Sequence, residues 1–100
     1  MIPANVVAIT FFKPSMDFWN TLKVGLELTL EREPNNPRDK NAIKVVYNGF
    51  HFGYVQKEVA MALASLMDTG KTFTAKITRI FGNPFDRPHI ELDIEEYQTK

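Results

Sequence analysis

Four side chains near the end of the chain are of types that could bind a metal ion or exchange protons. They occupy alternate positions of one predicted strand: His89, Glu91, Asp93 and Glu95. Successive strand side chains point to opposite faces, so these four share one face and Ile90, Leu92 and Ile94 share the other. Metal or acid–base chemistry needs such groups in a cleft. Because the aliphatic face must be the buried one, we expect a solvated acidic face, partly balanced by Lys76, and no metal site.

A second candidate site is the polar segment Leu30–Val45. Between positions 34 and 41 it holds two prolines, three asparagines and one aspartate. Proline fixes φ, and Asn and Asp side chains bond to nearby backbone, so this composition predicts a stiff loop between two strands. Taken alone, these residues are those of a well-made turn. Basic residues gather in the same region, at Arg32, Arg38, Lys40 and Lys44, so a basic patch could form here.

Composition limits the class of protein. The chain has 100 residues, 44% hydrophobic and 24% charged, which suits a single folded domain over residues 1–100. It contains no cysteine, which excludes disulfides, a thiolate nucleophile and cysteine-bound zinc. The formal net charge is zero, so nucleic-acid binding would depend on a local patch. Without a signal peptide or a membrane-spanning apolar stretch, we expect a cytoplasmic protein, or a nuclear one in a eukaryote.

Alternation of apolar and polar residues predicts six strands. The alternating apolar positions are Val7, Ile9 and Phe11; Leu26, Leu28 and Leu30; Ile43, Val45 and Tyr47; Phe50, Phe52 and Tyr54; Phe73, Ala75 and Ile77; and Ile90, Leu92 and Ile94. Asn48-Gly49 joins the third run to the fourth and favours a tight type I′ hairpin. A turn-rich loop, 82–88, separates the last two runs.

Helical spacing predicts one main helix, from about Lys57 to Thr69, with Gly70 placed to end it. Its apolar stripe consists of Val59, Leu63, Leu66 and Met67. A shorter helical turn is expected within 15–22, where Ser15 or Asp17 could cap it. Apolar residues of that turn, Phe18, Trp19 and Leu22, would pack inward.

Six short strands and one main helix cannot cover both faces of a flat sheet. A closed or nearly closed barrel buries one face of every strand. We therefore predict a mainly β fold with one main helix, a small six-stranded barrel related to the OB-fold, which often binds ligands across an open face. A β-sandwich is the alternative, but the helix between the fourth and fifth strands argues against it.

The polar loop and the segments after it resemble the HIRAN domain family. The similarity rests on REPNNPRDKNAIKV, a hairpin, GYVQKEVAMALASLMDTG and a late FGNPF, and it covers nearly the whole chain. Its most specific part is the Asn-Pro-x-Asp-x-Asn-Ala-Ile run, followed at the expected distance by Gly-Tyr-Val and a Lys-Glu-Val-Ala helix start. The resemblance implies a modified OB-like barrel. In the best understood members this domain lies at the N-terminus of DNA-remodelling helicases and grips the 3′ end of single-stranded DNA.

The resemblance also implies a DNA site made by the end of the first strand, the loop, the start of the helix and the late loop. Its residues would be Thr10, Phe11, Asn36, Arg38, Asp39, Tyr54, Lys57, Phe81 and Phe85. Asp39 would accept a hydrogen bond from a 3′ hydroxyl and repel a phosphate. Lys57 and the free N–H groups of the helix start would attract a backbone phosphate. The three phenylalanines would offer stacking surfaces for bases.

Two residues depart from the family pattern. Thr10 stands where DNA-end-binding members have a basic residue, and Arg38 stands where a stacking aromatic is usual. An arginine can still stack on a base or pair with a phosphate, so a rearranged site is compatible with the sequence. Phe11 shares the parity of the first alternating run, so a core position is the alternative for it. His51 is expected at the surface of the hairpin.

The function expected is a nucleic-acid-binding module that recognises single-stranded DNA and its 3′ end in DNA repair or at replication forks. We expect it to act as a monomer, without a cofactor or membrane contact, and with a helicase or nuclease as a protein partner. No serine elbow, phosphate loop or ATPase motif is present, so no enzyme activity is expected. The alternatives are a protein-interaction module that has lost DNA-end recognition, which zero net charge would suit, and a metal-dependent nuclease on the acidic strand.

Overall fold

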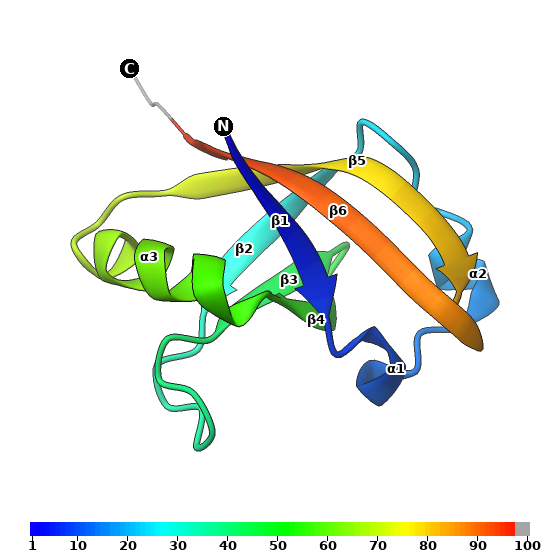
Figure 1. The fold of residues 1–100 in the computed structure, drawn as a ribbon, viewed down its shortest axis with the longest axis horizontal. Coiled ribbons are helices and arrows are strands. Elements are labelled where there is room, and N and C mark those ends of the chain that lie inside the picture. Colours follow the sequence, from blue (N-terminus) through cyan, green and yellow to red (C-terminus); the bar gives the residue numbers. More distant parts are fainter. Residues whose placement is uncertain (98–100) are drawn as a thin grey trace.

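Six strands form a closed antiparallel barrel in the computed structural model, which describes residues 1–97 (Figure 1). The strands are β1 (Ile2–Val7), β2 (Glu27–Arg32), β3 (Ile43–Tyr47), β4 (Phe50–Val55), β5 (Phe73–Asn83) and β6 (Asp86–Glu96). The helices are α1 (Ile9–Phe12), α2 (Met16–Trp19) and α3 (Lys57–Asp68). The strand order is β1-β4-β3-β2-β5-β6, and pairing of β6 with β1 closes the barrel. The predicted six-stranded barrel with one main helix is therefore confirmed.

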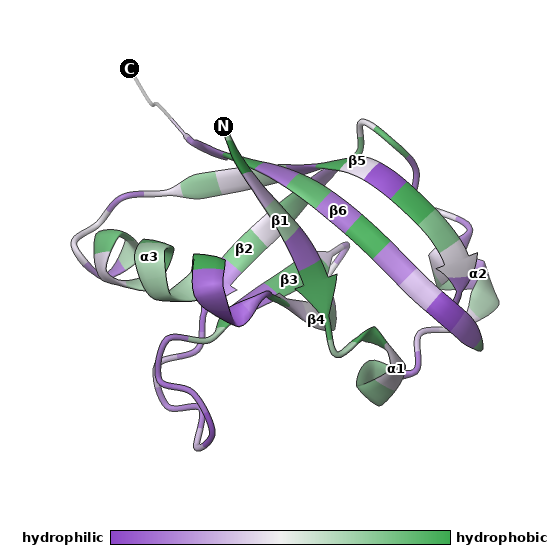
Figure 2. Ribbon diagram, in the orientation of Figure 1, coloured by the Kyte–Doolittle hydropathy of each residue, from purple (hydrophilic) through white to green (hydrophobic). Residues whose placement is uncertain are grey.

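One face of every strand fills the barrel interior. The most deeply buried large side chains include Leu28, Ile43, Phe52, Ile77, Ile90, Leu92 and Ile94. Hydrophobic and hydrophilic positions alternate along β6 in Figure 2, as expected for a strand with one face in the core and one in solvent. The alternating runs predicted this inward face correctly for β2, β3, β5 and β6, whereas in β4 Phe52 is buried, Tyr54 is half-buried and Phe50 is exposed.

The hairpin between β3 and β4 turns at Asn48 and Gly49, as predicted. Their φ angles are 52° and 80°, so both central residues lie in the left-handed region that a type I′ turn requires. A register shift between Val45 and Val46 interrupts the pairing with β4. This irregularity buries both valines, where strict alternation would have exposed the second.

The first strand ends earlier than predicted. It covers Ile2–Val7, and its inward residues are Ala4 and Val6. Ala8 has φ 66°, a left-handed conformation that breaks the strand and turns the chain into α1. The alternation of Val7, Ile9 and Phe11 is therefore not a strand pattern, and the prediction of a strand there is wrong.

The last two strands are longer than predicted. They extend through most of the expected 82–88 loop, and Asn83 pairs with Asp86 across a short connection. Left-handed backbone at Gly82 and Arg87 accompanies a register shift, so the hairpin continues past residues whose types usually end a strand. Phe81 therefore lies on a strand, and Phe85 lies at the tip of the hairpin.

Two helices match their predicted positions. In α2, the Ser15 hydroxyl accepts a hydrogen bond from the backbone N–H of Phe18 at 3.0 Å, which is the expected N-terminal cap. In α3, the buried residues are Ala60, Leu63 and Ala64. The buried stripe is thus rotated towards the two alanines and away from Leu66, because small side chains let the helix approach the barrel closely. No helix within residues 1–97 is long and apolar enough to cross a membrane.

Candidate functional site

A groove of about 560 Å³ opens where the end of β1, α1, the loop 33–42 and the corner between β4 and α3 meet. It is lined by Val7, Ala8, Phe11, Asn36, Pro37, Arg38, Asp39, Ala42, Tyr54, Val55 and Lys57. Six predicted site residues line it: Phe11, Asn36, Arg38, Asp39, Tyr54 and Lys57. The fold thus brings together side chains that are up to 46 positions apart in the sequence.

The short helix α1 presents Phe11 at the mouth of this groove. Ile9 is buried and anchors the helix, whereas the Phe11 side chain is 73% exposed. The backbone is left-handed at both ends of α1, at Ala8 and Lys13, which sets the helix as a separate turn outside the barrel wall. Phe11 is therefore not a core residue. Thr10 is exposed on the same helix and is not among the residues that line the groove.

The loop 33–42 holds its shape through its own hydrogen bonds, as its composition predicted. The Asn36 Oδ1 atom accepts bonds from the backbone N–H groups of Arg38 at 2.8 Å and Asp39 at 3.1 Å. Asp39 Oδ1 accepts one from the backbone N–H of Asn41 at 2.9 Å. Within residues 1–97, Asp39 Oδ2 has no hydrogen-bond donor, so this oxygen can accept a bond from a ligand in the groove.

Arg32 fastens this loop to α3. Its guanidinium donates to the backbone oxygens of Ala42 at 2.7 Å and Lys40 at 2.9 Å, and it also pairs with Asp68 at 2.9 Å. The hydrogen bond from Arg32 holds the pKa of Asp68 below its usual value. The Arg32 guanidinium therefore makes its hydrogen bonds within the protein. Lys44 also pairs with a carboxylate, that of Glu31, at 3.5 Å. Of the four clustered basic residues, Arg38 and Lys40 are the exposed ones.

Tyr54 stands at the groove floor with its hydroxyl fully engaged. It donates a hydrogen bond to Glu33 Oε1 at 2.6 Å and accepts one from Asn36 Nδ2 at 3.3 Å. Burial, the hydrogen bond to Glu33 and the charge of Glu33 raise the pKa of Tyr54 to about 12. The phenol is therefore neutral at physiological pH and contributes a ring face and a dipole, not a charge.

His51 lies behind Tyr54 and is not the surface residue that was predicted. Its ring packs against Phe12 at 4.2 Å and against Tyr54 at 4.8 Å between centroids. Its Nε2 atom is buried and has no hydrogen-bond partner within the described residues. Burial lowers the pKa of His51 below its usual value, which favours the neutral ring at physiological pH. The sequence did not reveal α1, whose Phe12 covers this face of the hairpin.

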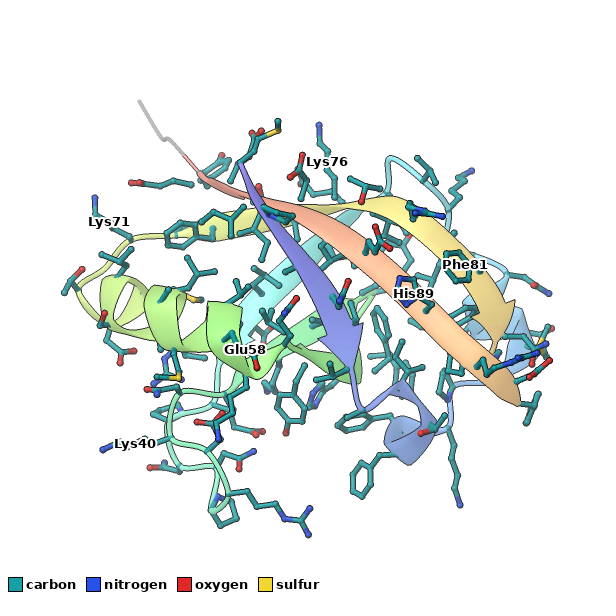
Figure 3. The ribbon with its side chains drawn as sticks, in the orientation of Figure 1. Lys40, Glu58, Lys71, Lys76, Phe81 and His89 are labelled. Atoms are coloured by element: carbon teal, nitrogen blue, oxygen red, sulfur yellow. The ribbon has the colours of Figure 1, made fainter. Side chains whose placement is uncertain are left out.

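Lys57 begins α3 at the edge of the groove and is exposed. The first N–H groups of a helix have no partner within the helix, so they can bind an anion. Gln56 pins this corner to β1, because its Oε1 accepts from the Asn5 N–H at 2.7 Å and its N–H donates to Asn5 at 3.0 Å. Glu58 follows Lys57 in the sequence, and Figure 3 shows Glu58 at the helix start. A hydrogen bond from its own backbone N–H lowers the pKa of the Glu58 carboxyl.

Phe81 and Phe85 are not brought to the groove. Phe81 lies on the outer face of the β5–β6 hairpin, stacked on His89 at 4.5 Å and with the Arg79 guanidinium 5.3 Å from its ring centroid. Figure 3 shows Phe81 and His89 side by side on this hairpin, at the opposite end of the view from Lys40 of the loop 33–42. Phe85 is 78% exposed at the hairpin tip. Their part in DNA binding stays a prediction.

The acidic face of β6 has cationic neighbours. Glu91 accepts a bond from His89 at 2.7 Å and lies 3.9 Å from Arg79, and Asp93 lies opposite Lys76 in the register of β5 and β6. Within residues 1–97, no three His, Cys, Asp or Glu side chains are grouped closely enough to hold a metal ion.

Several groove residues could not be found from the sequence. Val7, Ala8 and Val55 form an apolar wall, but Val7 was assigned to an uninterrupted strand and Ala8 carries no turn signal. Glu33 contacts Tyr54 and Asn36, which line the groove, and its only signal was its place three residues before Asn36. These contacts arise from tertiary structure, which residue spacing alone does not reveal.

Curated proteins that match the chain are much longer than it is. A rabbit (Oryctolagus cuniculus) protein named helicase-like transcription factor is 62% identical over 42 residues, which is 41% of this chain and 4% of that protein. A rice (Oryza sativa subsp. japonica) Fanconi-associated nuclease 1 homolog is 43% identical over 51 residues, which is 47% of this chain and 5% of that protein. The chain therefore spans a small fraction of the length of these relatives.

Solved structures match nearly the whole chain. The crystal structure of the HIRAN domain of human HLTF superposes with a TM-score of 0.75 and 30% identity, covering 95% of this chain and 73% of that one. The NMR structure of the HLTF HIRAN domain in its DNA-bound conformation gives a TM-score of 0.60 and 28% identity, covering 95% and 72%. The sequence model described as the HIRAN domain matches residues 1–95. This chain belongs to the HIRAN domain family.

Proposed function

We propose that this domain binds single-stranded DNA and holds its free 3′ end in the groove between α1, the loop 33–42 and the start of α3. The observation that carries the proposal is the convergence in one groove of an exposed aromatic ring, a carboxylate oxygen that accepts no hydrogen bond from residues 1–97 and an exposed lysine: Phe11, Asp39 and Lys57. These groups suit, in turn, a base, a hydroxyl and a phosphate.

The base would be held by stacking. Phe11 offers an exposed ring at the groove mouth, and Tyr54 offers a neutral ring at its floor. Stacking of a base on an aromatic side chain is worth about 1–3 kcal/mol and tolerates any sequence, because every base has a π face. Arg38, which replaces the usual aromatic of the family, can add its guanidinium plane to the same stack.

The terminal nucleotide would be selected through Asp39. Its Oδ2, which has no donor in the described part of the chain, can accept a hydrogen bond from a 3′ hydroxyl, whereas a 3′ phosphate would bring negative charge against a carboxylate. The internal phosphate of the same nucleotide would lie towards Lys57 and the N–H groups that begin α3. The groove thus offers opposite charges to the two ends of one nucleotide.

The relatives support a role in binding DNA. One matched structure is of the HLTF HIRAN domain in its DNA-bound conformation, and the matched curated proteins are named as a helicase-like factor and a nuclease homolog. We therefore propose that the domain presents DNA to a helicase or nuclease, either in the same polypeptide or in a partner protein.

Fluorescence anisotropy with labelled single-stranded DNA tests the proposal. Oligonucleotides ending in a 3′ hydroxyl or a 3′ phosphate are titrated with the wild-type chain, Asp39→Ala and Lys57→Ala. We expect the wild type to prefer the hydroxyl end, Asp39→Ala to lose this preference, and Lys57→Ala to bind both oligonucleotides more weakly. Lys76→Ala is the matched control, because it removes the same charge from β5 at a position that does not line the groove. Failure to bind DNA even at low salt would refute the proposal.

A protein-interaction module is the second candidate. The observation that favours it is Phe85, a large apolar side chain that is 78% exposed at the tip of the β5–β6 hairpin and outside the groove. The variant Phe85→Ala in the same titrations separates the possibilities. Weaker DNA binding would assign the hairpin tip to DNA, whereas unchanged binding would leave it available for a protein partner.

A further inference from the structure

Glu33 lies beside the groove without lining it. It is the first residue after β2, and its backbone N–H donates to the Ala42 oxygen at 3.0 Å, which joins the two ends of the loop. One atom of its side chain, Oε1, accepts two hydrogen bonds, from the Tyr54 hydroxyl and from Asn36 Nδ2, each at 2.6 Å. A single carboxylate oxygen thus contacts two of the groove residues.

Asn36 links Glu33 to the backbone of the rest of the loop. An amide side chain has a donor end and an acceptor end, and Glu33 can bond only to the donor end. The acceptor end, Oδ1, then receives the backbone N–H groups of Arg38 and Asp39. A reversed Asn36 amide would lose both of these bonds and place its oxygen against the Glu33 carboxylate.

We infer that Glu33 is a positioning residue for the groove: it fixes the Tyr54 ring directly and, through Asn36, the backbone that carries Arg38 and Asp39. The inference rests on the proposed function, since it assigns to Glu33 the alignment of groups that would contact the DNA end. Glu33 would thus belong to the site although it does not line the groove.

The charge of Glu33 is part of this role. Hydrogen bonds to an ionised carboxylate are short and roughly twice as strong as neutral ones. The bonds from Tyr54 and Asn36 hold the pKa of Glu33 below its usual value, so the carboxyl is ionised at neutral pH. Direct contact with DNA is a poor alternative for it, because its bonded oxygen is already shared by two donors and its charge would repel a phosphate.

The test compares Glu33→Ala with Glu33→Gln in DNA titrations. The glutamine oxygen can still accept both hydrogen bonds, so it keeps the geometry and loses only the charge. We expect Glu33→Ala to weaken binding of 3′-hydroxyl DNA about tenfold, as for loss of bonds to a charged group, and Glu33→Gln to recover part of that affinity, because its neutral hydrogen bonds keep the geometry but are weaker. Glu31→Ala is the control, because it removes a carboxylate two residues earlier in the chain that pairs with Lys44 outside the groove.

A second readout needs no DNA. In NMR spectra of the free protein, we expect Glu33→Ala to shift the Tyr54 ring signals and the backbone amides of Arg38 and Asp39, and Glu33→Gln to shift them much less. Unmoved signals in Glu33→Ala would overturn the inference. If the wild-type chain binds DNA, an unchanged DNA affinity of Glu33→Ala would also overturn it. A wild-type chain that binds no DNA would refute the proposed function alone, and the NMR signals would still decide whether Glu33 positions the loop.

Discussion

Arg32 and Asp68 form a two-point ion pair that joins the end of β2 to the last turn of α3. Arg32 Nε lies 2.9 Å from Asp68 Oδ1, and its NH2 group donates to Oδ2 at 3.2 Å. The same guanidinium binds two backbone oxygens near the end of the loop 33–42. One side chain, 13% exposed, therefore ties the groove-lining loop to the helix that forms the opposite edge of the groove.

Replacing Arg32 should destabilise the protein more than replacing its partner. Arg32→Ala removes the side-chain donor of the Lys40 carbonyl and one of the two donors of the Ala42 carbonyl, and we expect it to lower the free energy of unfolding by about 1–3 kcal/mol. Asp68→Asn removes only an exposed charge, so we expect a loss of about 0–1 kcal/mol. Urea denaturation of both variants measures the difference. Equal losses would show that the ion pair, and not the loop contacts, is the stabilising part.

His51 should make stability depend on pH. Its pKa in the folded protein is lowered below 6.5, mainly by burial, so the unfolded chain binds a proton more readily than the folded one. The contribution is fully present above about 6.5, the histidine pKa of an unfolded chain, and is lost progressively as the pH falls from there towards the folded-state pKa. We expect the free energy of unfolding to decrease with falling pH in that range.

His51→Phe should remove this pH dependence, because phenylalanine keeps the ring that packs on Phe12 and has no titrating group. It should not lower stability at neutral pH, since it also removes the buried Nε2 atom that lacks a partner within residues 1–97. His89→Gln is the control that retains His51. Thermal unfolding from pH 7 downwards measures both, and an unchanged slope in His51→Phe would contradict the assignment.

Gly53 should not tolerate a side chain. A Cβ atom at this position would lie 2.9 Å from the Val7 backbone oxygen and would collide with Val6 Cγ1. We expect Gly53→Ala to lower the free energy of unfolding by about 1–3 kcal/mol, as overpacking does elsewhere. Truncating the colliding side chain in Gly53→Ala/Val6→Ala should cost less than the sum of the single changes. Additive losses in a double-mutant cycle would show that the clash is not with Val6.

Strand alternation predicted most of the barrel because a closed barrel buries one face of every strand. Leu28, Leu30, Phe52 and Ile94 are all buried where their parity placed them. The prediction failed at Ile9 because a single left-handed residue before it turns a strand pattern into one turn of helix, and that residue is an alanine, which has no preference for such a conformation.

The sequence predicted groove residues that belong to the loop motif or the helix start. It did not predict residues that act on the groove through other side chains. Asp39 and Lys57 were found from the loop motif and the helix start, and both line the groove. Glu33 and Phe12 were missed because neither lines the groove and each depends on contacts with residues distant in sequence, Glu33 with Tyr54 and Phe12 with His51. Such contacts depend on how α1 and the loop fold over β4, which no spacing along the chain encodes.

Phe11 should account for much of the affinity of the proposed DNA site. It is exposed without a core role, so Phe11→Ala is expected to leave stability nearly unchanged and to weaken single-stranded DNA binding by about 1–3 kcal/mol, the usual loss for one stacked base. Phe11→Tyr keeps a stacking ring and should bind like the wild type. Val24→Ala removes an exposed apolar side chain outside the groove and is the control. If Phe11→Ala bound DNA as tightly as Val24→Ala, the ring at the groove mouth would not be where a base stacks, and Tyr54 and Arg38 would have to hold the base by themselves.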